Sequence, residues 1–431
     1  MKETKFKQTE VGMIPSDWEV KFLSEIGSFS KGSGISRSES NSGNLPAIRY
    51  GEIYTKHNDY IKAFYSHISK EVANKSTRIY RGDVLFSASG ETKEDIGKTV
   101  AFLESIEAYA GGDIIIMSPK CPVNSMFLGY ILNFPAIAKQ KAMKAQGDAV
   151  VHITTDSLRK LQVCIPKTTK EQQRIANALS DVDSLIANLE KLIAKKKNIK
   201  QGAMQQLLNG KKRLPGFAPA KPTYKQTELG MIPTDWEVKN LADLGYFFSG
   251  SGFPLKYQGH VDGKYPFYKV SDFNNVGNDF SMNIANNYVS EQIARKLGCK
   301  IIPKNAILFA KIGAAIMLER KKICTRACCA DNNMMAFICY DFCDAAFMNA
   351  VLAMIKFADY SASSALPSLS SRTLGTIQIA VPHSKAEQTA IANVLSDMDT
   401  EISALETKLA KYRTLKTGMM QQLLTGKIRL I

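Results

Sequence analysis

Two stretches of the chain place apolar residues at alternating steps of three and four. One lies between positions 179 and 193, and the other, between 391 and 412, has the same phase after a shift of 216. This spacing predicts two long helices, each with an apolar seam that needs a partner helix. The predicted seam residues are Leu179, Val182, Ile186, Leu189 and Ile193 in the first helix and Leu395, Met398, Ile402, Leu405, Leu409 and Tyr412 in the second.

Each predicted helix has a start signal. Thr168 stands three residues before Glu171, and Ser384 stands three residues before Glu387. This spacing is typical of a capping box, in which the glutamate returns a hydrogen bond to the backbone of the cap residue. We therefore expect the helices to begin at these positions.

The predicted helices are long rods. From 171 to 201 the rise per residue gives roughly 45 Å, and glycines at 202 and 418 are expected to weaken each helix before a short turn continues. A lone rod would leave its seam in water, so we expect the two helices to pair within one chain, antiparallel, with pseudo-two-fold symmetry. Folding of each helix onto its own domain, or dimerisation of two chains, are the alternatives.

The other segments predict mixed α/β domains. Turn-then-strand patterns occur at 78–87 and 302–310, and short strands at 158–166 and 374–382 lead into the long helices. These signals recur at matching places. The two regions are therefore expected to share one fold and to differ in their surface loops.

The chain also repeats its own sequence. KQTEVGMIPSDWEVK at 7–21 returns as KQTELGMIPTDWEVK at 225–239, with 13 of 15 positions identical, and 171–214 matches 387–430 at 25 of 44 positions. A period of about 217 residues is too long for a solenoid repeat. It indicates two copies of a whole domain with constant ends and divergent middles.

These patterns predict an α+β protein with two similar globular domains, each followed by a long helix. The expected divisions are a first domain at 1–166 (repeat motif at 7–21), a helix region at 167–213, a Pro-rich linker at 214–224, a second domain at 225–382 and a helix region at 383–431.

The chain carries a formal charge of +16 and has a pI near 9.3. Such a balance favours a polyanionic partner, because Lys and Arg near phosphates release condensed counterions. The first ten residues lack an apolar core, and the most apolar stretch, 334–358, is interrupted by Asp341, Asp344 and Lys356. We expect no signal peptide, no membrane span and a cytoplasmic location.

Catalytic and metal patterns are weak. Asp83 with Glu91 and Lys93 resembles a metal-dependent nuclease pattern, but the second copy has Ala306 in place of Asp83. Gly97-Lys98-Thr99 lacks the first glycine of a phosphate-binding loop. The eight cysteines lie in apolar, strand-like runs rather than Gly-rich knuckles, which favours buried thiols over zinc ligands. We expect no catalytic residues and no bound metal.

Basic, hydroxyl and aromatic residues in the two divergent regions are the best candidates for a binding surface, because such side chains bind phosphates and base edges. The candidate DNA-binding residues are Lys31, Arg37, Arg49, Tyr50, Lys56, Arg78, Ser89 and Lys93 in the first region and Tyr257, Lys264, Lys269, Lys311, Arg320, Lys322 and Arg372 in the second.

Taken together, these elements resemble the specificity subunit of a type I restriction–modification system. The resemblance covers essentially the whole chain and is carried by GMIPSDWEV and GMIPTDWEV, by EQQRIANALSDVD and EQTAIANVLSDMD, and by MQQLLNGKKRL and MQQLLTGKIRL. Lys196, at the place of Tyr412, departs from the seam pattern and is expected to weaken the seam near the end of the first helix.

The resemblance implies that each divergent region is a target recognition domain that reads one half of a bipartite, asymmetric site in double-stranded DNA. The helices would set the gap and dock two methyltransferase subunits, and a restriction and translocase subunit would then join. S-adenosylmethionine, ATP and Mg²⁺ would belong to those partners, with no cofactor in this chain. A stand-alone metal-dependent endonuclease and a coiled-coil protein adaptor remain the alternatives.

Overall fold

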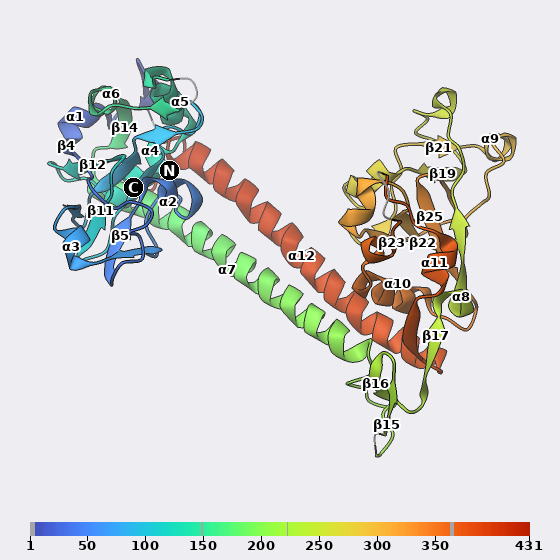
Figure 1. Ribbon diagram of the computed structural model, residues 1–431. Helices are drawn as coiled ribbons and strands as arrows, with labels where there is room; N and C mark the ends of the chain where they lie inside the picture. Colours follow the sequence, from blue (N-terminus) through green and yellow to red (C-terminus); the bar gives the residue numbers. More distant parts are fainter. Residues whose placement is uncertain (1–4, 148–149, 222, 363–365) are drawn as a thin grey trace. The chain divides into compact units, whose positions relative to one another are not determined.

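The computed structural model describes residues 5–147, 150–221, 223–362 and 366–431 (Figure 1). The chain divides into two compact units, residues 1–190 with 408–431, and residues 191–407. Each unit therefore holds one globular domain and parts of both long helices. Residues 1–4 of the expected N-terminal segment and residue 222 of the expected linker lie outside the described residues.

The first unit is built on two four-stranded sheets, in the orders β10-β8-β12-β4 and β6-β5-β11-β7. Two-stranded pairs β1-β2, β14-β3 and β13-β9 flank them. The strands are β1 (Phe6–Thr9), β2 (Gly12–Pro15), β3 (Trp18–Phe22), β4 (Gly27–Lys31), β5 (Leu45–Ile48), β6 (Ser66–Ile68), β7 (Thr77–Ile79), β8 (Val84–Ser87), β9 (Ser89–Gly90), β10 (Thr99–Ala101), β11 (Ala108–Ala110), β12 (Ile114–Pro119), β13 (Val151–His152) and β14 (Gln162–Pro166). The short helices are α1 (Leu23–Ile26), α2 (Tyr50–Thr55), α3 (Lys70–Ala73), α4 (Ser125–Leu132), α5 (Pro135–Lys144) and α6 (Thr155–Arg159).

The second unit has a five-stranded sheet in the order β18-β25-β22-β23-β20 and a three-stranded sheet in the order β21-β19-β24. The hairpin β15-β16 and the pair β17-β26 correspond to β1-β2 and β3-β14. The strands are β15 (Tyr224–Thr227), β16 (Gly230–Pro233), β17 (Trp236–Asn240), β18 (Gly245–Ser249), β19 (Tyr265–Tyr268), β20 (Ser281–Met282), β21 (Tyr288–Val289), β22 (Ile307–Ala310), β23 (Lys321–Cys324), β24 (Cys329–Ala330), β25 (Met334–Cys339) and β26 (Gln378–Pro382). The short helices are α8 (Leu241–Leu244), η1 (Leu255–Tyr257), η2 (Val270–Asn274), α9 (Glu291–Lys296), η3 (Ala314–Leu318), α10 (Ala345–Met354), η4 (Phe357–Tyr360) and α11 (Ser371–Gly375).

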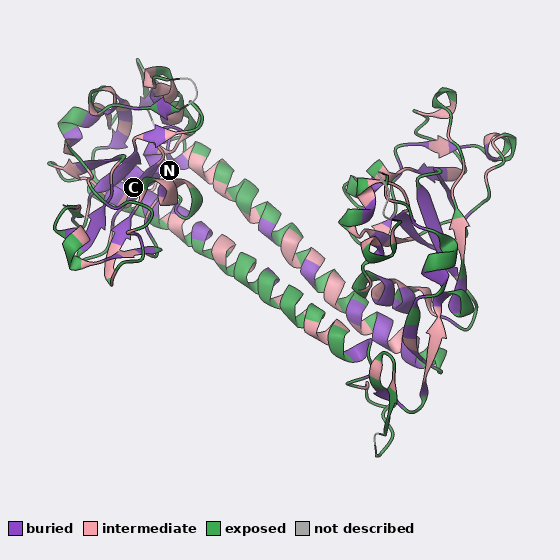
Figure 2. Cartoon of the chain, viewed as in Figure 1, coloured by how far each residue is buried: buried purple, intermediate pink, exposed green. Residues whose placement is uncertain are grey.

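The central strands read as continuous apolar runs because both of their faces are buried. In β8, Val84 and Phe86 belong to one hydrophobic core, whereas Leu85 belongs to another. In β22, Ile307 and Phe309 likewise belong to one core, and Leu308 belongs to another. Alternate side chains of a strand point to opposite faces, so each central strand joins two cores, which are the purple regions of each unit in Figure 2.

The two long helices, α7 (Thr169–Leu207) and α12 (Lys385–Leu423), have 39 residues each. Both run without interruption through Gly202 and Gly418, so the expected weakening there is wrong. A glycine inside a helix costs only about 1 kcal/mol relative to alanine, and the leucines that follow at 207–208 and 423–424 are buried in the cores of the two units. No helix among the described residues is long and apolar enough to cross a membrane.

Within each unit the two long helices lie side by side and run antiparallel, as predicted. In the first unit Lys416 Nζ lies 2.7 Å from Asp183 Oδ1, and Arg413 Nη2 lies 2.6 Å from Glu190 Oε1. Lys200–Asp399 and Lys197–Glu406 form the corresponding pairs in the second unit. The pairing within one chain replaces the alternatives of separate helices or an intermolecular seam. Of the predicted seam residues, Leu179, Val182, Ile193, Leu395, Ile402 and Leu409 are buried, and Ile186, Leu189, Met398, Leu405 and Tyr412 are half-buried.

Lys196 lies in this seam as a charged exception. Its Nζ is 2.6 Å from Glu401 Oε1. The corresponding positions of the first unit are Tyr412 and Leu185, neither of which is charged. The second unit thus has a half-exposed ion pair where the first unit has two uncharged residues.

The predicted capping boxes form only in part. Thr168 Oγ1 accepts a hydrogen bond from the Glu171 amide at 3.4 Å, but the Glu171 carboxylate accepts from Arg429 Nε at 2.6 Å. Glu387 is bound in the same way by Arg213. The expected return bond from the glutamate to the cap backbone is therefore wrong at both helices, because a guanidinium from the distant end of the other helix takes its place.

This arrangement forms an arginine clamp in each unit. In the first unit, Arg429 also donates to both carboxylate oxygens of Asp17, at 2.8 and 2.7 Å, and its guanidinium lies 5.8 Å from the ring of Trp18. The second clamp consists of Arg213 with Glu387, Asp235 and Trp236, again with 5.8 Å between guanidinium and ring.

A glycine between each long helix and its clamp arginine is required by close packing. Gly426 has φ +69°, and a Cβ at this position would lie 2.3 Å from Pro15 Cγ. Gly210 has φ +66°, and its Cβ would meet Pro233 at 2.6 Å. Only glycine satisfies both the left-handed backbone and the space. The repeated leucine-glycine-arginine ends thus close the same junction in each unit.

Candidate nucleic-acid interface

Four chain segments meet at one end of the sheets in the first unit. Strand β4 ends at Lys31, and β5 ends just before Arg49. Ala110 of β11 pairs with Ile48 on one side and with Thr77 on the other. The Thr77 hydroxyl donates to the carbonyl of Lys31 at 2.9 Å. The first strand-end surface therefore brings together Lys31, Arg49, Tyr50 and Arg78.

The loop after β4 crosses these strand ends. The Ser33 amide donates to the Ala110 carbonyl, and the hydroxyls of Ser33 and Thr77 lie 3.0 Å apart. A Cβ on Gly32 would lie 2.1 Å from the Gly111 carbonyl oxygen, so the crossing requires glycine. The loop then presents Arg37, which is exposed and has no side-chain hydrogen bond or ion pair with a described residue.

The second unit repeats this backbone with other side chains. Strand β18 ends at Ser249, β19 ends just before Lys269, and β22 ends just before Lys311. Lys311 Nζ donates to Ser249 Oγ at 3.1 Å, and Lys269 Nζ donates to Gln258 Oε1 at 2.9 Å. A Cβ on Gly250 would lie 1.9 Å from the Asp331 carbonyl oxygen. Ser249, Lys269 and Lys311 define the second strand-end surface.

One candidate residue of the second unit lies elsewhere, and two others differ in exposure. Lys264 precedes β19, at the opposite end from Lys269, and forms an ion pair with Glu291. Tyr257 is half-buried in η1, and Arg372 is exposed on α11. The structure therefore places Lys264 away from the second strand-end surface.

Arg320 and Lys322 brace the segment around η2 instead of standing free. Arg320 Nη1 donates to Asn274 Oδ1 at 2.5 Å. Lys322 Nζ donates to the carbonyls of Phe273, at 3.1 Å, and of Asn278. Burial lowers the pKa of Lys322. Both side chains shape a loop, and a contact of Lys322 with DNA would first have to break these bonds.

The remaining candidates of the first unit differ in accessibility. Lys56 and Lys93 are exposed, and Lys56 Nζ lies 5.4 Å from the ring centroid of Tyr65. Ser89 is buried, and its Oγ lies 2.9 Å from His152 Nδ1. The Ser89 hydroxyl does not reach the surface, so its assignment as a direct contact is corrected to support of the exposed His152.

The residues considered for nuclease chemistry hold a turn. Asp83 is buried, and its carboxylate accepts from the Tyr80 amide at 2.7 Å and from Ser118 Oγ at 2.6 Å. Glu91 and Lys93 are exposed in a later loop. Within the described parts of the chain, no group of three or more His, Cys, Asp or Glu side chains is arranged to hold a metal ion.

The cysteines are free thiols, and four of them are buried. Burial raises the pKa of the Cys329 thiol to about 12. Thiols held in the protonated form behave as small apolar side chains.

Sequence reasoning missed the hydroxyl residues at the strand ends. Ser33 and Thr77 in the first unit and Ser249 in the second lie beside the basic residues. Their signal is a glycine directly after a strand, at Gly32 and Gly250, because such a glycine marks a close backbone approach. Hydroxyls at this edge suit phosphate contacts.

Comparisons with known proteins agree with this geometry. Residues 15–201 and 233–411 each match the type I restriction modification DNA specificity domain. Two relatives from Methanocaldococcus jannaschii are the MjaVIII specificity subunit of a type I restriction enzyme, 24% identical over 99% of this chain and 97% of that protein, and the MjaIX specificity subunit, 27% identical over 74% and 72%. The fold is similar to that of a type I restriction-modification S subunit from M. genitalium, with a TM-score of 0.60, 14% identity and coverage of 97% and 98%.

Proposed function

The chain belongs to the family of type I restriction–modification DNA specificity subunits, and from this premise we propose that each target recognition domain reads one half of a bipartite, asymmetric DNA site. A specificity subunit is not itself catalytic, since methylation and restriction are carried out by other subunits. Family membership therefore excludes the stand-alone nuclease and the protein adaptor that the sequence left open.

The observation that carries the proposal is the pair of strand-end surfaces. The same strand ends and the same glycine crossing present Lys31 and Arg49 in one unit but Ser249 and Lys269 in the other. Arg78 lies beside the first pair and Lys311 beside the second, on different strands. Arg and Lys bind guanine edges and phosphates, and hydroxyls bind phosphates. Unlike side chains on one backbone support two readers with different preferences.

The paired helices are proposed to set the gap between the half-sites. Two readers on one face of B-DNA are about 35 Å apart, and a 39-residue helix is about 58 Å long. The ion pairs that recur in each unit support a fixed helix register. Two equivalent frames also support docking of two methyltransferase subunits, with a restriction and translocase subunit added later. S-adenosylmethionine, ATP and Mg²⁺ would serve those partners.

Methyladenine mapping tests the proposal. The full chain is co-expressed with its cognate methyltransferase subunit, and methylated adenines are located across the host genome. We expect a two-part motif with a fixed gap. Arg49→Ala and Lys269→Ala should each relax one half of the motif, with roughly 10- to 100-fold weaker discrimination there.

Lys264→Ala is the matched control, because it removes a lysine at the opposite end of β19 from Lys269. It should leave the motif unchanged. A continuous motif, or loss of discrimination in both halves from a single substitution, would contradict independent reading by the two domains.

A further inference from the structure

We propose that an apolar groove, found once in each unit, binds an apolar segment of the methyltransferase subunit that is flanked by acidic residues. The proposal rests on the proposed function and gives the docking site a location. It assigns one copy of the partner to each unit, at the groove beside the repeated hairpin.

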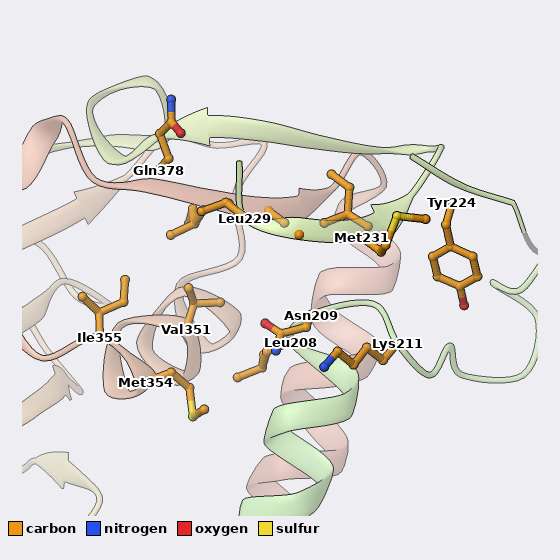
Figure 3. Close-up of a pocket in the computed structure, with 14 residues that line it drawn as sticks. Leu208, Asn209, Lys211, Tyr224, Leu229, Met231, Val351, Met354, Ile355 and Gln378 are labelled. Atoms are coloured by element: carbon orange, nitrogen blue, oxygen red, sulfur yellow. The ribbon is translucent and has the colours of Figure 1, made fainter. Parts of the chain in front are cut away.

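In the second unit the groove has a volume of about 790 Å³. Its walls are the hairpin β15-β16, helix α10 and the end of α7, and β26 lies along its base (Figure 3). Met231 projects from the hairpin, Val351 and Met354 from α10, and Leu208 from the turn that follows α7. Pockets of this size and apolar character are typical binding sites.

The first unit has a groove of the same volume, about 790 Å³, built from the corresponding elements. Hairpin β1-β2 contributes Met13, and the α4–α5 segment contributes Phe134 and Ile137. The turn after α12 contributes Leu424, and β14 lies at the base with Cys164. Two separate parts of the chain thus build one kind of groove.

The repeat motif is more alike than its packing requires. It is identical at 13 of 15 positions, yet only the isoleucine, proline and tryptophan of each copy are buried. Gly12 and Gly230 have φ of +108° and +96°, which explains one further identity. Met13 and Met231 are 57% and 52% exposed in the grooves. Identity at exposed positions indicates a common ligand, and flexible methionines suit an apolar protein surface.

The base of each groove favours a polypeptide as the ligand. In the antiparallel pairs β3-β14 and β17-β26, hydrogen-bonded and non-hydrogen-bonded residue pairs alternate. The backbone hydrogen bonds from Leu23 to Leu161 and from Leu241 to Ile377 show which residue pairs are hydrogen-bonded. With this alternation, the peptide groups of Cys164 and Ala380 point away from β3 and β17. Neither group has a hydrogen bond to another described residue. Unpaired strand edges are ready partners for an added peptide.

The charges at the groove rims indicate which charge the partner segment should carry. Lys139, Lys144 and Lys160 line the first groove, whose one acidic residue, Glu10, accepts from Gln162 Nε2 at 3.1 Å. Lys211 lines the second groove, and none of the described residues that line it is acidic. Both rims are therefore positive, so acidic residues beside the apolar segment would be complementary.

Native mass spectrometry of the full chain, co-expressed with the methyltransferase subunit, tests the proposal. Wild-type chain should carry two methyltransferase copies. Met13→Asp and Met231→Asp, each at an exposed position, should leave one copy each, and the double variant should leave none. Each substitution should weaken its site by roughly 10- to 100-fold, because a carboxylate would be buried in an apolar site.

Ile106→Asp and Ile301→Asp are the controls, since both side chains are exposed and neither lines a groove. Both should keep two copies. If the wild-type chain binds two copies and the double variant does too, the groove proposal is overturned while the proposed function stands. If the wild-type chain binds no methyltransferase, the proposed function itself fails. Self-association that Met13→Asp abolishes would make a second copy of this chain the ligand and overturn the proposal.

Discussion

The arginine clamps agree in every partner, whereas the strand-end surfaces share only their backbone. Each clamp joins one guanidinium to a buried glutamate, an exposed aspartate and a buried tryptophan. At the strand ends, Arg49 of one unit corresponds to Lys269 of the other, and Lys31 corresponds to Ser249. The difference shows that this fold fixes its junctions by side chains, whereas the strand-end surfaces, which are proposed to read DNA, share only their backbone. The side chains of these surfaces can then vary without disturbing the frame.

The largest expected effect comes from breaking a clamp. Arg429→Met would leave the buried Glu171 carboxylate without a partner, and Arg213→Met would do the same to Glu387. Removal of one partner of a buried ion pair costs about 3–5 kcal/mol, and the side chains concerned are at most 9% exposed. We expect each variant to lower the free energy of unfolding of its own unit by about 3–5 kcal/mol. Calorimetry would detect this as a lower melting temperature for that unit.

Asp17→Asn is the matched control for the clamp prediction. The Asp17 side chain is 57% exposed, and Arg429 lowers the pKa of its carboxyl through their hydrogen bond. Exposed ion pairs contribute about 1 kcal/mol or less. If Arg429→Met cost no more than Asp17→Asn, the clamp would be a surface feature and not a junction.

The second prediction uses a difference between the units. His57 of the first unit is buried, and this burial, with a smaller contribution from Lys98, lowers its pKa to about 4. His260 and His383 of the second unit are exposed. Between pH 6.5 and 4 an unfolded histidine binds a proton that the folded one does not, so the free energy of unfolding falls as pH falls.

We expect the first unit to lose roughly 1 kcal/mol per pH unit in that window, and about 3 kcal/mol across it. His57→Phe should flatten this dependence, and His383→Gln should not change it. Thermal melts at half-unit steps of pH would measure both variants. Equal acid sensitivity of wild-type and His57→Phe would show that other groups govern the transition.

The two long helices and the duplicated frame could be read directly from the sequence. Their seam positions follow a local period, and their repeat is visible without any structure. The partners of Glu171 and Asp83 could not be read, because Arg429 and Ser118 are distant in sequence and a local motif predicts only local bonds. The choice of candidate DNA-binding residues was limited in the same way, because the sequence does not show which residues the fold brings together. Lys264 and Lys269 are five residues apart, but a four-residue strand places them at opposite ends.

Among basic residues, sequence alone also cannot separate those that bind a ligand from those that brace the protein. Lys322 and Arg320 have the composition of a DNA contact, yet they hold the segment around η2. The side chains of Arg37 and Arg49 have no such bond to any residue that the structure describes. Whether a basic side chain braces the protein or stays available for a ligand depends on which carbonyl oxygens the folded loops place near it.

The smallest expected effect concerns the point where the seams differ. Lys196 forms an ion pair with Glu401, and their side chains are 33% and 49% exposed. Such pairs contribute about 0.2–1 kcal/mol. Lys196→Tyr would restore the aromatic residue that Tyr412 supplies in the other helix, exchanging a screened ion pair for apolar contact. We expect the free energy of unfolding to change by no more than about 1 kcal/mol in either direction. Melting temperatures at low and high salt would measure this change.

The wild-type chain should lose stability with salt relative to the variant, because only the wild-type chain has the Lys196–Glu401 pair to screen. A salt response identical in both proteins would mean that this pair contributes nothing to the helix register.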